Sequence, residues 1–115
     1  MEIKRFEGNG RMSKVVRFGD TLYLCGQVSQ SGGCIQEQTK DVLGKIDALL
    51  TAHGSDKQHV LSALIHIKSM KEFALMNEVW DAWVEKGHEP ARTCVEANMA
   101  AETVLVEITV VATVK

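Results

Sequence analysis

The amino-acid sequence predicts a single α+β domain, residues 1–115, in which one mixed β-sheet carries two helices on one face. Three observations support this fold class. The length leaves room for one hydrophobic core, and a content of 45% hydrophobic and 24% charged residues is ordinary for a globular protein. Two segments have the apolar period of helices, and the remaining patterned segments resemble strands. Each predicted helix lies between two predicted strands, which favours crossovers onto a shared sheet.

Three short strands are predicted in the N-terminal part of the chain. The first is expected at residues 1–7. Lys14–Phe18 and Thr21–Cys25 form a hairpin, because the connection Gly19-Asp20 has the length and residue types of a tight β-turn. The polar and glycine-rich segment Ser29–Gly33 is then expected as a turn.

The first helix is predicted from about Gln36 to His53. Its apolar residues recur at helical spacing and are expected to face the core: Val42, Leu43, Ile46, Leu49 and Leu50. Gly54 follows at the place of a C-terminal cap glycine. Gly44, inside the helix, costs about 1 kcal/mol relative to alanine, and its small size would let a neighbouring group approach closely.

The second half predicts strand, helix and two strands. Val60–Lys68 is rich in β-branched and apolar residues and is predicted as a strand. Lys71–Lys86 is the second helix, which a glycine and a proline end. Its apolar face consists of Phe73, Met76, Trp80 and Trp83. The strands Arg92–Ala97 and Thr103–Val114 complete the chain.

The last strand is expected to be buried on one face only. Alternate residues of this strand share a face, and one face is apolar throughout: Val104, Val106, Ile108, Val110, Ala112 and Val114. The other face is mixed: Leu105, Glu107, Thr109, Val111 and Thr113. Two helices of this size cover one face of a sheet, so the partly apolar second face favours contact with another subunit. We therefore expect an oligomer.

Composition argues against several classes of partner. Thirteen basic and fifteen acidic residues give a formal charge of -2, without the basic surface that supplies most nucleic-acid affinity. No apolar run approaches the roughly 20 residues that span a bilayer, so we expect no membrane association. Residues 1–6 lack the apolar core of a signal peptide, and we expect a cytoplasmic protein with reduced thiols. The cysteines and histidines lack metal-ligand spacing, so no metal site is expected.

An arginine and a glutamate near the C-terminus are the strongest candidates for chemistry. Arg92 lies on the penultimate strand, and Glu107 interrupts the pattern of the last one. A guanidinium binds a carboxylate bidentately, and a glutamate can hold and polarise a water. We expect neighbouring strands to bring both side chains into one wet pocket at a subunit boundary, where a small carboxylate-bearing molecule is attacked by water. A salt bridge between them is the structural alternative, because a buried carboxylate needs a partner.

Three further residues have a functional and a structural interpretation. Cys94 shares a face with Arg92 and could be a nucleophile, but a free cysteine is more often a small buried hydrophobe. Asn77, in the middle of the second helix, is either exposed or hydrogen-bonded to a neighbouring loop. His66 points away from the isoleucines on either side of it and is expected to be structural.

Several motifs of the chain resemble those of one known family. Pro90–Ala97 (P-A-R-T-C-V-E-A), followed by Val106–Ile108 (V-E-I), matches the C-terminal signature of the reactive intermediate deaminases (RidA, formerly YjgF) in residue type and spacing. Gly26–Val28 resembles the S-G-Q motif of that family, and Phe73–Trp80 resembles its F-x-x-[VM]-N-x-x-[YW] helix. The resemblance spans essentially the whole chain, and its helix motif looks most similar to the short YoaB-like branch.

The resemblance implies a chorismate-mutase-like fold assembled as a homotrimer with clefts between subunits. It also implies hydrolysis of enamines and imines, such as 2-aminoacrylate and its imino tautomer, to 2-keto acids and ammonia without a cofactor. In this pattern Arg92 grips the substrate carboxylate and Glu107 orients the attacking water. The backbone carbonyl of Cys94 accepts a hydrogen bond from the substrate nitrogen, and Gly26 lines the cleft.

Two other positions are expected in the substrate site. Asn77 belongs to the helix motif, and Met12 stands where active members of the family usually have a tyrosine. The missing tyrosine motivates an alternative function, a non-catalytic trimer whose clefts bind small carboxylate metabolites. An RNA-directed activity, attributed to some members, is not expected, because the acidic balance and 5% aromatic content lack the features that bind single-stranded RNA.

Overall fold

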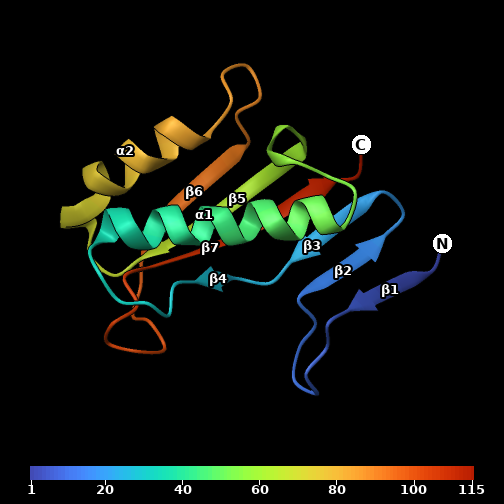
Figure 1. The fold of residues 1–115 in the computed structure, drawn as a ribbon, viewed down its shortest axis with the longest axis horizontal. Helices are drawn as coiled ribbons and strands as arrows, with labels where there is room; N and C mark the ends of the chain where they lie inside the picture. The colour runs from blue at the N-terminus through green and yellow to red at the C-terminus, as the bar shows by residue number, and fades with distance from the viewer.

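Seven strands form one sheet, and both helices lie on the same side of it in the computed structural model, which describes residues 1–115 (Figure 1). The elements are β1 (Ile3–Phe6), β2 (Val15–Phe18), β3 (Thr21–Leu24), β4 (Gln27–Val28), α1 (Ile35–Ala52), β5 (Val60–Ile67), α2 (Phe73–Trp83), β6 (Ala91–Glu96) and β7 (Val106–Thr113). Short 3-10 helices, η1 (Lys57–His59) and η2 (Met70–Glu72), precede β5 and α2. The predicted α+β class, with one sheet and two helices, is confirmed.

The last strand of the sequence occupies the middle of the sheet. The strands lie in the order β1-β2-β3-β7-β5-β6, and β4 also pairs with β7. The β5–β6 pair is parallel and the other pairs are antiparallel, so the sheet is mixed as predicted. β6 forms one edge of the sheet and β1 the other, and β5 separates β6 from β7.

The core lies between the sheet and the helices. The even-numbered residues of β7 from Val106 to Ala112 are at most 1% exposed, and the residues between them are partly exposed. This confirms the one-sided burial predicted for the strand. The helices complete the core with side chains of two segments: Ile35, Val42, Leu43, Ile46 and Leu50 of α1, and Met76 and Trp80 of α2.

The other side of the sheet, the open face, is uncovered and partly apolar. It carries the odd-numbered side chains of β7 together with Tyr23, Leu64 and Val95, which the strand register places on the same side. These three side chains are 48%, 39% and 41% exposed. An exposed apolar sheet face of this kind is typical of a surface that binds another protein.

The element boundaries differ from the predicted ones at several places. The strand β4 was not predicted, α1 starts at Ile35, and β7 starts at Val106 rather than Thr103. α2 ends at Trp83 instead of Lys86, because Val84 turns to an extended conformation and buries its side chain. Neither helix is long and apolar enough to cross a membrane.

The sequence made specific predictions for a glycine inside α1 and for one that follows it. Gly54 follows the helix with a φ of +78°, as expected for a cap glycine. A Cβ on Gly44 would meet no atom within 4 Å, so the structure shows no close neighbour at this position.

Candidate active site

Arg92 and Glu107 point to opposite faces of the sheet. Cys94 pairs with Ile65, and Ile65 pairs with Ile108. Both isoleucines face the helices, so Cys94 and Arg92, two residues apart on β6, face the helices as well. Glu107, next to Ile108, faces the open side. The expectation that the two residues lie on neighbouring strands is wrong, because β5 separates β6 from β7. Because their side chains face opposite sides of the sheet, a single chain neither joins them in one pocket nor forms a salt bridge between them.

Arg92 is held by the side chains of α2. Its Nη1 donates a hydrogen bond of 2.9 Å to Oδ1 of Asn77. The guanidinium carbon lies 5.2 Å from the centroid of the Trp80 ring and 5.8 Å from that of Phe73, which are cation–π distances. Asn77 thus binds Arg92 rather than a loop. A guanidinium has five N–H donors, so most of them remain for a ligand.

The backbone of β6 adds hydrogen-bonding groups beside this arginine. The N–H of Ala97 donates to the carbonyl of Ile67 on β5, so odd-numbered residues of β6 direct their backbone polar groups at β5. Even-numbered residues, Arg92 and Cys94 among them, direct theirs outward from the sheet edge. The carbonyl of Cys94 is therefore free to accept a hydrogen bond, as the sequence interpretation requires.

The Cys94 thiol itself is a poor nucleophile. Burial raises the pKa of the thiol, and the positive charge of Arg92 only partly opposes that rise. A protonated thiol attacks slowly. This favours the interpretation of the side chain as a small packed hydrophobe over a nucleophilic role.

Glu107 lies against Gly26 on the open face. A Cβ on Gly26 would lie 2.5 Å from Oε2 of Glu107, closer than two such atoms can approach. Gly26 sits at a bulge, because the four steps from Tyr23 to Gln27 oppose three steps on β7 from Val111 to Ile108. A larger residue here would displace the Glu107 carboxylate, although the φ of Gly26 is not positive and would itself accept a side chain.

Glu107 lines one of two adjoining hollows. Glu107 lines a cavity of about 440 Å³ together with His66, Val104 and the segment 97–101. A second hollow, of about 510 Å³, is lined by Met12 and Gly26, and both hollows include Val28 and Gln30. Three of the predicted site residues thus line two hollows that share Val28 and Gln30.

Met12 is displayed by the loop between β1 and β2. Oδ1 of Asn9 accepts hydrogen bonds of 2.9 Å from the backbone N–H groups of Arg11 and Met12, which fixes the loop. The Met12 side chain is 44% exposed. It therefore presents a flexible apolar group to the hollow.

The predicted site residues consequently form two groups. We call Asn77, Arg92 and Cys94 the arginine half-site, and Met12, Gly26 and Glu107 the glutamate half-site. Sequence analysis missed two contributors: the ring of Trp80, which was expected only in the core, and His66, whose Nδ1 lies 3.9 Å from Oε1 of Glu107. Trp80 lies on α2 with its ring near Arg92, which only the packing of α2 on the sheet shows, and His66 lies opposite Glu107, which only the strand register shows.

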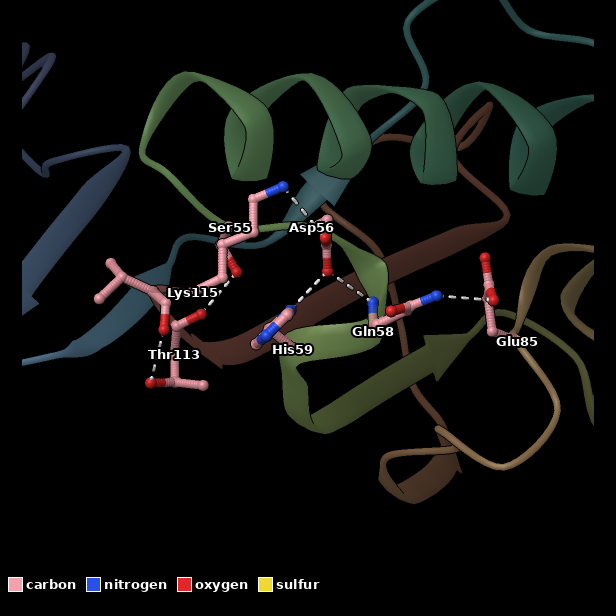
Figure 2. Close-up of polar contacts among 8 residues, drawn as sticks. Ser55, Asp56, Gln58, His59, Glu85, Thr113 and Lys115 are labelled. Carbon is pink, nitrogen blue, oxygen red and sulfur yellow. Dashed lines mark hydrogen bonds and ion pairs between the residues drawn. The ribbon is translucent and has the colours of Figure 1, made fainter.

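A separate polar cluster fixes the C-terminus and belongs to neither half-site (Figure 2). Asp56 accepts hydrogen bonds from Nδ1 of His59 at 2.6 Å and from Nζ of Lys115 at 3.3 Å. The hydrogen bond from His59 holds the pKa of the Asp56 carboxyl below its usual value. Nowhere in the chain do three His, Cys, Asp or Glu side chains gather as metal ligands.

Comparisons with known proteins agree over the full chain. Residues 2–114 match the family model described as Endoribonuclease L-PSP. The RutC family protein YoaB of Escherichia coli (strain K12) is 40% identical over 114 residues, 99% of this chain and 100% of that protein. A RutC family protein of Haemophilus influenzae is 40% identical over 115 residues, 98% and 99%. A crystal structure of a YjgF family member from Neisseria meningitidis matches with a TM-score of 0.97 and 44% identity, covering 100% of this chain and 97% of that one.

Proposed function

This chain belongs to the YjgF (endoribonuclease L-PSP) family, as its motifs predicted, and from this premise we propose that it hydrolyses small 2-imino acids to 2-keto acids and ammonia. The substrates would include 2-iminopropanoate, the tautomer of 2-aminoacrylate. No cofactor takes part in the proposed reaction.

The observation that carries this proposal is the division of the site into two incomplete halves. The arginine half-site has free donors at the edge of the sheet, and the glutamate half-site lies on the partly apolar open face. In a homotrimer with cyclic symmetry, one surface of each subunit meets a different surface of the next, and three identical clefts result. We propose that Arg92 of one subunit faces Glu107 of its neighbour across each cleft.

The proposed site supplies what imine hydrolysis needs. Arg92 grips the substrate carboxylate, and the carbonyl of Cys94 accepts a hydrogen bond from the imine N–H, which fixes the electrophilic carbon. Glu107 holds a water against that carbon and takes its proton as the oxygen attacks. Glu107 returns this proton to the nitrogen, which gives the neutral carbinolamine. Glu107 then takes the hydroxyl proton and transfers it to the nitrogen as the C–N bond breaks, which leaves a 2-keto acid and ammonia.

The test combines two inactive variants. Arg92→Ala and Glu107→Gln are each expected to lose the acceleration of imino-acid hydrolysis, measured with 2-iminobutanoate generated in situ by an amino-acid oxidase. When the two variants are unfolded, mixed in equal amounts and refolded, about a quarter of the clefts receive both intact residues. The mixture should therefore regain about a quarter of the wild-type rate. Each variant refolded alone is the control.

The possible results distinguish a failure of the proposed reaction from a failure of the proposed site between subunits. A wild-type protein that accelerates hydrolysis of no 2-imino acid would remove the catalytic proposal. An active wild type whose variant mixture stays inactive would show that each site is built within one subunit.

A second candidate is a non-catalytic trimer that binds small carboxylate metabolites in the same clefts. The exposed Met12, in place of the tyrosine expected from the resemblance, favours it. Calorimetry with 2-ketobutyrate distinguishes the two functions: binding that Arg92→Ala abolishes, without turnover of any imino acid, would support the binding protein. Cleavage of RNA at low salt would instead support the activity that the description of the family model names.

A further inference from the structure

His66 and Glu107 form a cross-strand pair on the open face. The two residues lie directly opposite each other on β5 and β7, and both line the same cavity. Nδ1 of His66 is 3.9 Å from Oε1 of Glu107. Side chains that oppose each other in an antiparallel pair are within reach of direct contact.

Neither group has another partner in the chain. Nδ1 of His66 is the one buried side-chain nitrogen or oxygen without a hydrogen-bond partner. Buried polar atoms of native proteins are almost always paired. The other polar side chains at the cavity, Gln30 and Asn98, carry no charge, so Glu107 is the only carboxylate there. Glu107 is therefore the strongest acceptor available to this nitrogen.

The geometry needs only a small adjustment to form the bond. A hydrogen bond from N–H to oxygen spans about 2.7–3.2 Å, so the present 3.9 Å must close by about 1 Å. Rotation of the partly exposed Glu107 side chain can provide this shift. On its other side the carboxylate lies beside Gly26, where an added Cβ would be 2.5 Å from Oε2. Contact with both residues would hold the carboxylate in one orientation.

We infer that His66 is a positioning residue: its Nδ1–H donates a hydrogen bond to Oε1 of Glu107 and orients the carboxylate that accepts the proton of the attacking water. The catalytic part of this inference rests on the proposed function, whereas the hydrogen bond itself does not. A histidine whose Nδ1 carries the proton has a free Nε2, which is the less common tautomer of a neutral imidazole in water. The bond therefore has a spectroscopic signature.

Nitrogen-15 NMR of protein labelled in its histidines tests the bond without any activity. The His66→Phe spectrum identifies the His66 signals. We expect the proton on Nδ1 in the wild type, and a shift of the population toward the Nε2–H tautomer in Glu107→Ala. An unprotonated Nδ1 in the wild type, or a tautomer that Glu107→Ala leaves unchanged, would overturn the inference.

Kinetic measurements test the positioning role with two variants of His66 whose side-chain amide N–H lies at different positions. His66→Asn puts an N–H near the position of Nδ1, and His66→Gln puts it near that of Nε2. Loss of one hydrogen bond to a charged group predicts that His66→Gln and His66→Phe lower kcat about tenfold with little change in KM. His66→Asn should recover most of the wild-type kcat. His88→Phe, at an exposed loop position, is the control and should keep the wild-type rate.

The two assays distinguish a failed inference from a failed function. Equal kcat values for the wild type and His66→Phe would remove the positioning role while leaving the deaminase proposal intact. An Nδ1–H tautomer that depends on Glu107, in a protein with no deaminase activity, would keep the hydrogen bond and remove the proposed function.

Discussion

Substituting Gly26 with alanine tests whether the position of the Glu107 carboxylate controls the rate. The φ of Gly26 is not positive, so an alanine can adopt the backbone conformation found here. The new Cβ would lie 2.5 Å from Oε2 and 2.8 Å from Cδ of Glu107. Ordinary contacts are about 3.4 Å or longer, so the carboxylate must move by about 1 Å.

The expected loss of activity is large and the expected loss of stability small. A displacement of about 1 Å in a catalytic group can reduce the rate by about 100-fold, which corresponds to about 2.7 kcal/mol in the activation free energy. The group that moves is a side chain at the surface, and its rotation costs little. Replacing a glycine also reduces the entropy of the unfolded chain, which contributes about 0.4–1 kcal/mol to stability. The free energy of unfolding should therefore change by less than about 1 kcal/mol.

The matched control is Gly44→Ala in α1. A Cβ at Gly44 meets no atom within 4 Å, and alanine in a helix is about 1 kcal/mol more favourable than glycine. This variant should gain about 4 °C in Tm and keep the wild-type kcat. The assay measures 2-keto acid release from 2-iminobutanoate above the spontaneous rate, with thermal unfolding in parallel. A folded Gly26→Ala variant with the wild-type kcat would refute the argument that the space at Gly26 sets the position of Glu107 on which the proposed reaction depends.

Two further predictions concern the thiols and the C-terminal cluster. Iodoacetamide near neutral pH should modify the exposed Cys34 first and Cys94 last, because burial raises the pKa of the Cys94 thiol; peptide mass spectrometry that finds equal rates would contradict this. The hydrogen bond from His59 lowers the pKa of Asp56 below its ordinary 3.8. The folded state therefore binds a proton at Asp56 less readily than the unfolded state does. The resulting stabilisation is fully present above pH 3.8 and is lost as the pH falls through the pKa of the folded state. Asp56→Asn should therefore lower the free energy of unfolding by about 0.5–1 kcal/mol at pH 7 and by less at acid pH, as denaturant titrations at pH 7 and at acid pH would show.

The sequence predicted the secondary structure and the burial of individual strands well. The alternation in Val106–Thr113 identified which residues enter the core, because a strand covered on one face has a clear period of two. Gly54 marked the end of α1 for a local reason, its left-handed backbone. The strand β4 was missed because two residues, Gln27 and Val28, carry no pattern of their own. Only their pairing with β7, about eighty positions later in the chain, makes them a strand.

The relation between Arg92 and Glu107 could not be derived from strand patterns. Alternation shows which residues of one strand share a face, but it does not show which face of one strand corresponds to which face of another. That correspondence requires the register through Ile65, the residue of β5 that links Cys94 to Ile108. The prediction that the two residues share one pocket therefore rested on residue type and on the family resemblance. It fails for one chain, and it stays a prediction for the assembled protein.

If the site is divided between two subunits, the Glu107 carboxylate needs a stabilising partner that it does not need in a monomer. Its side chain is 38% exposed in the single chain and is well solvated there. If a neighbouring subunit covers the open face, the carboxylate loses water, and an unpaired buried charge is strongly unfavourable. Arg92 of the neighbour would offset this loss only until a substrate carboxylate engages that guanidinium. His66, in the same chain as Glu107, can stabilise the charge in both states, so the hydrogen bond inferred here should matter more in the assembled protein than in the isolated subunit.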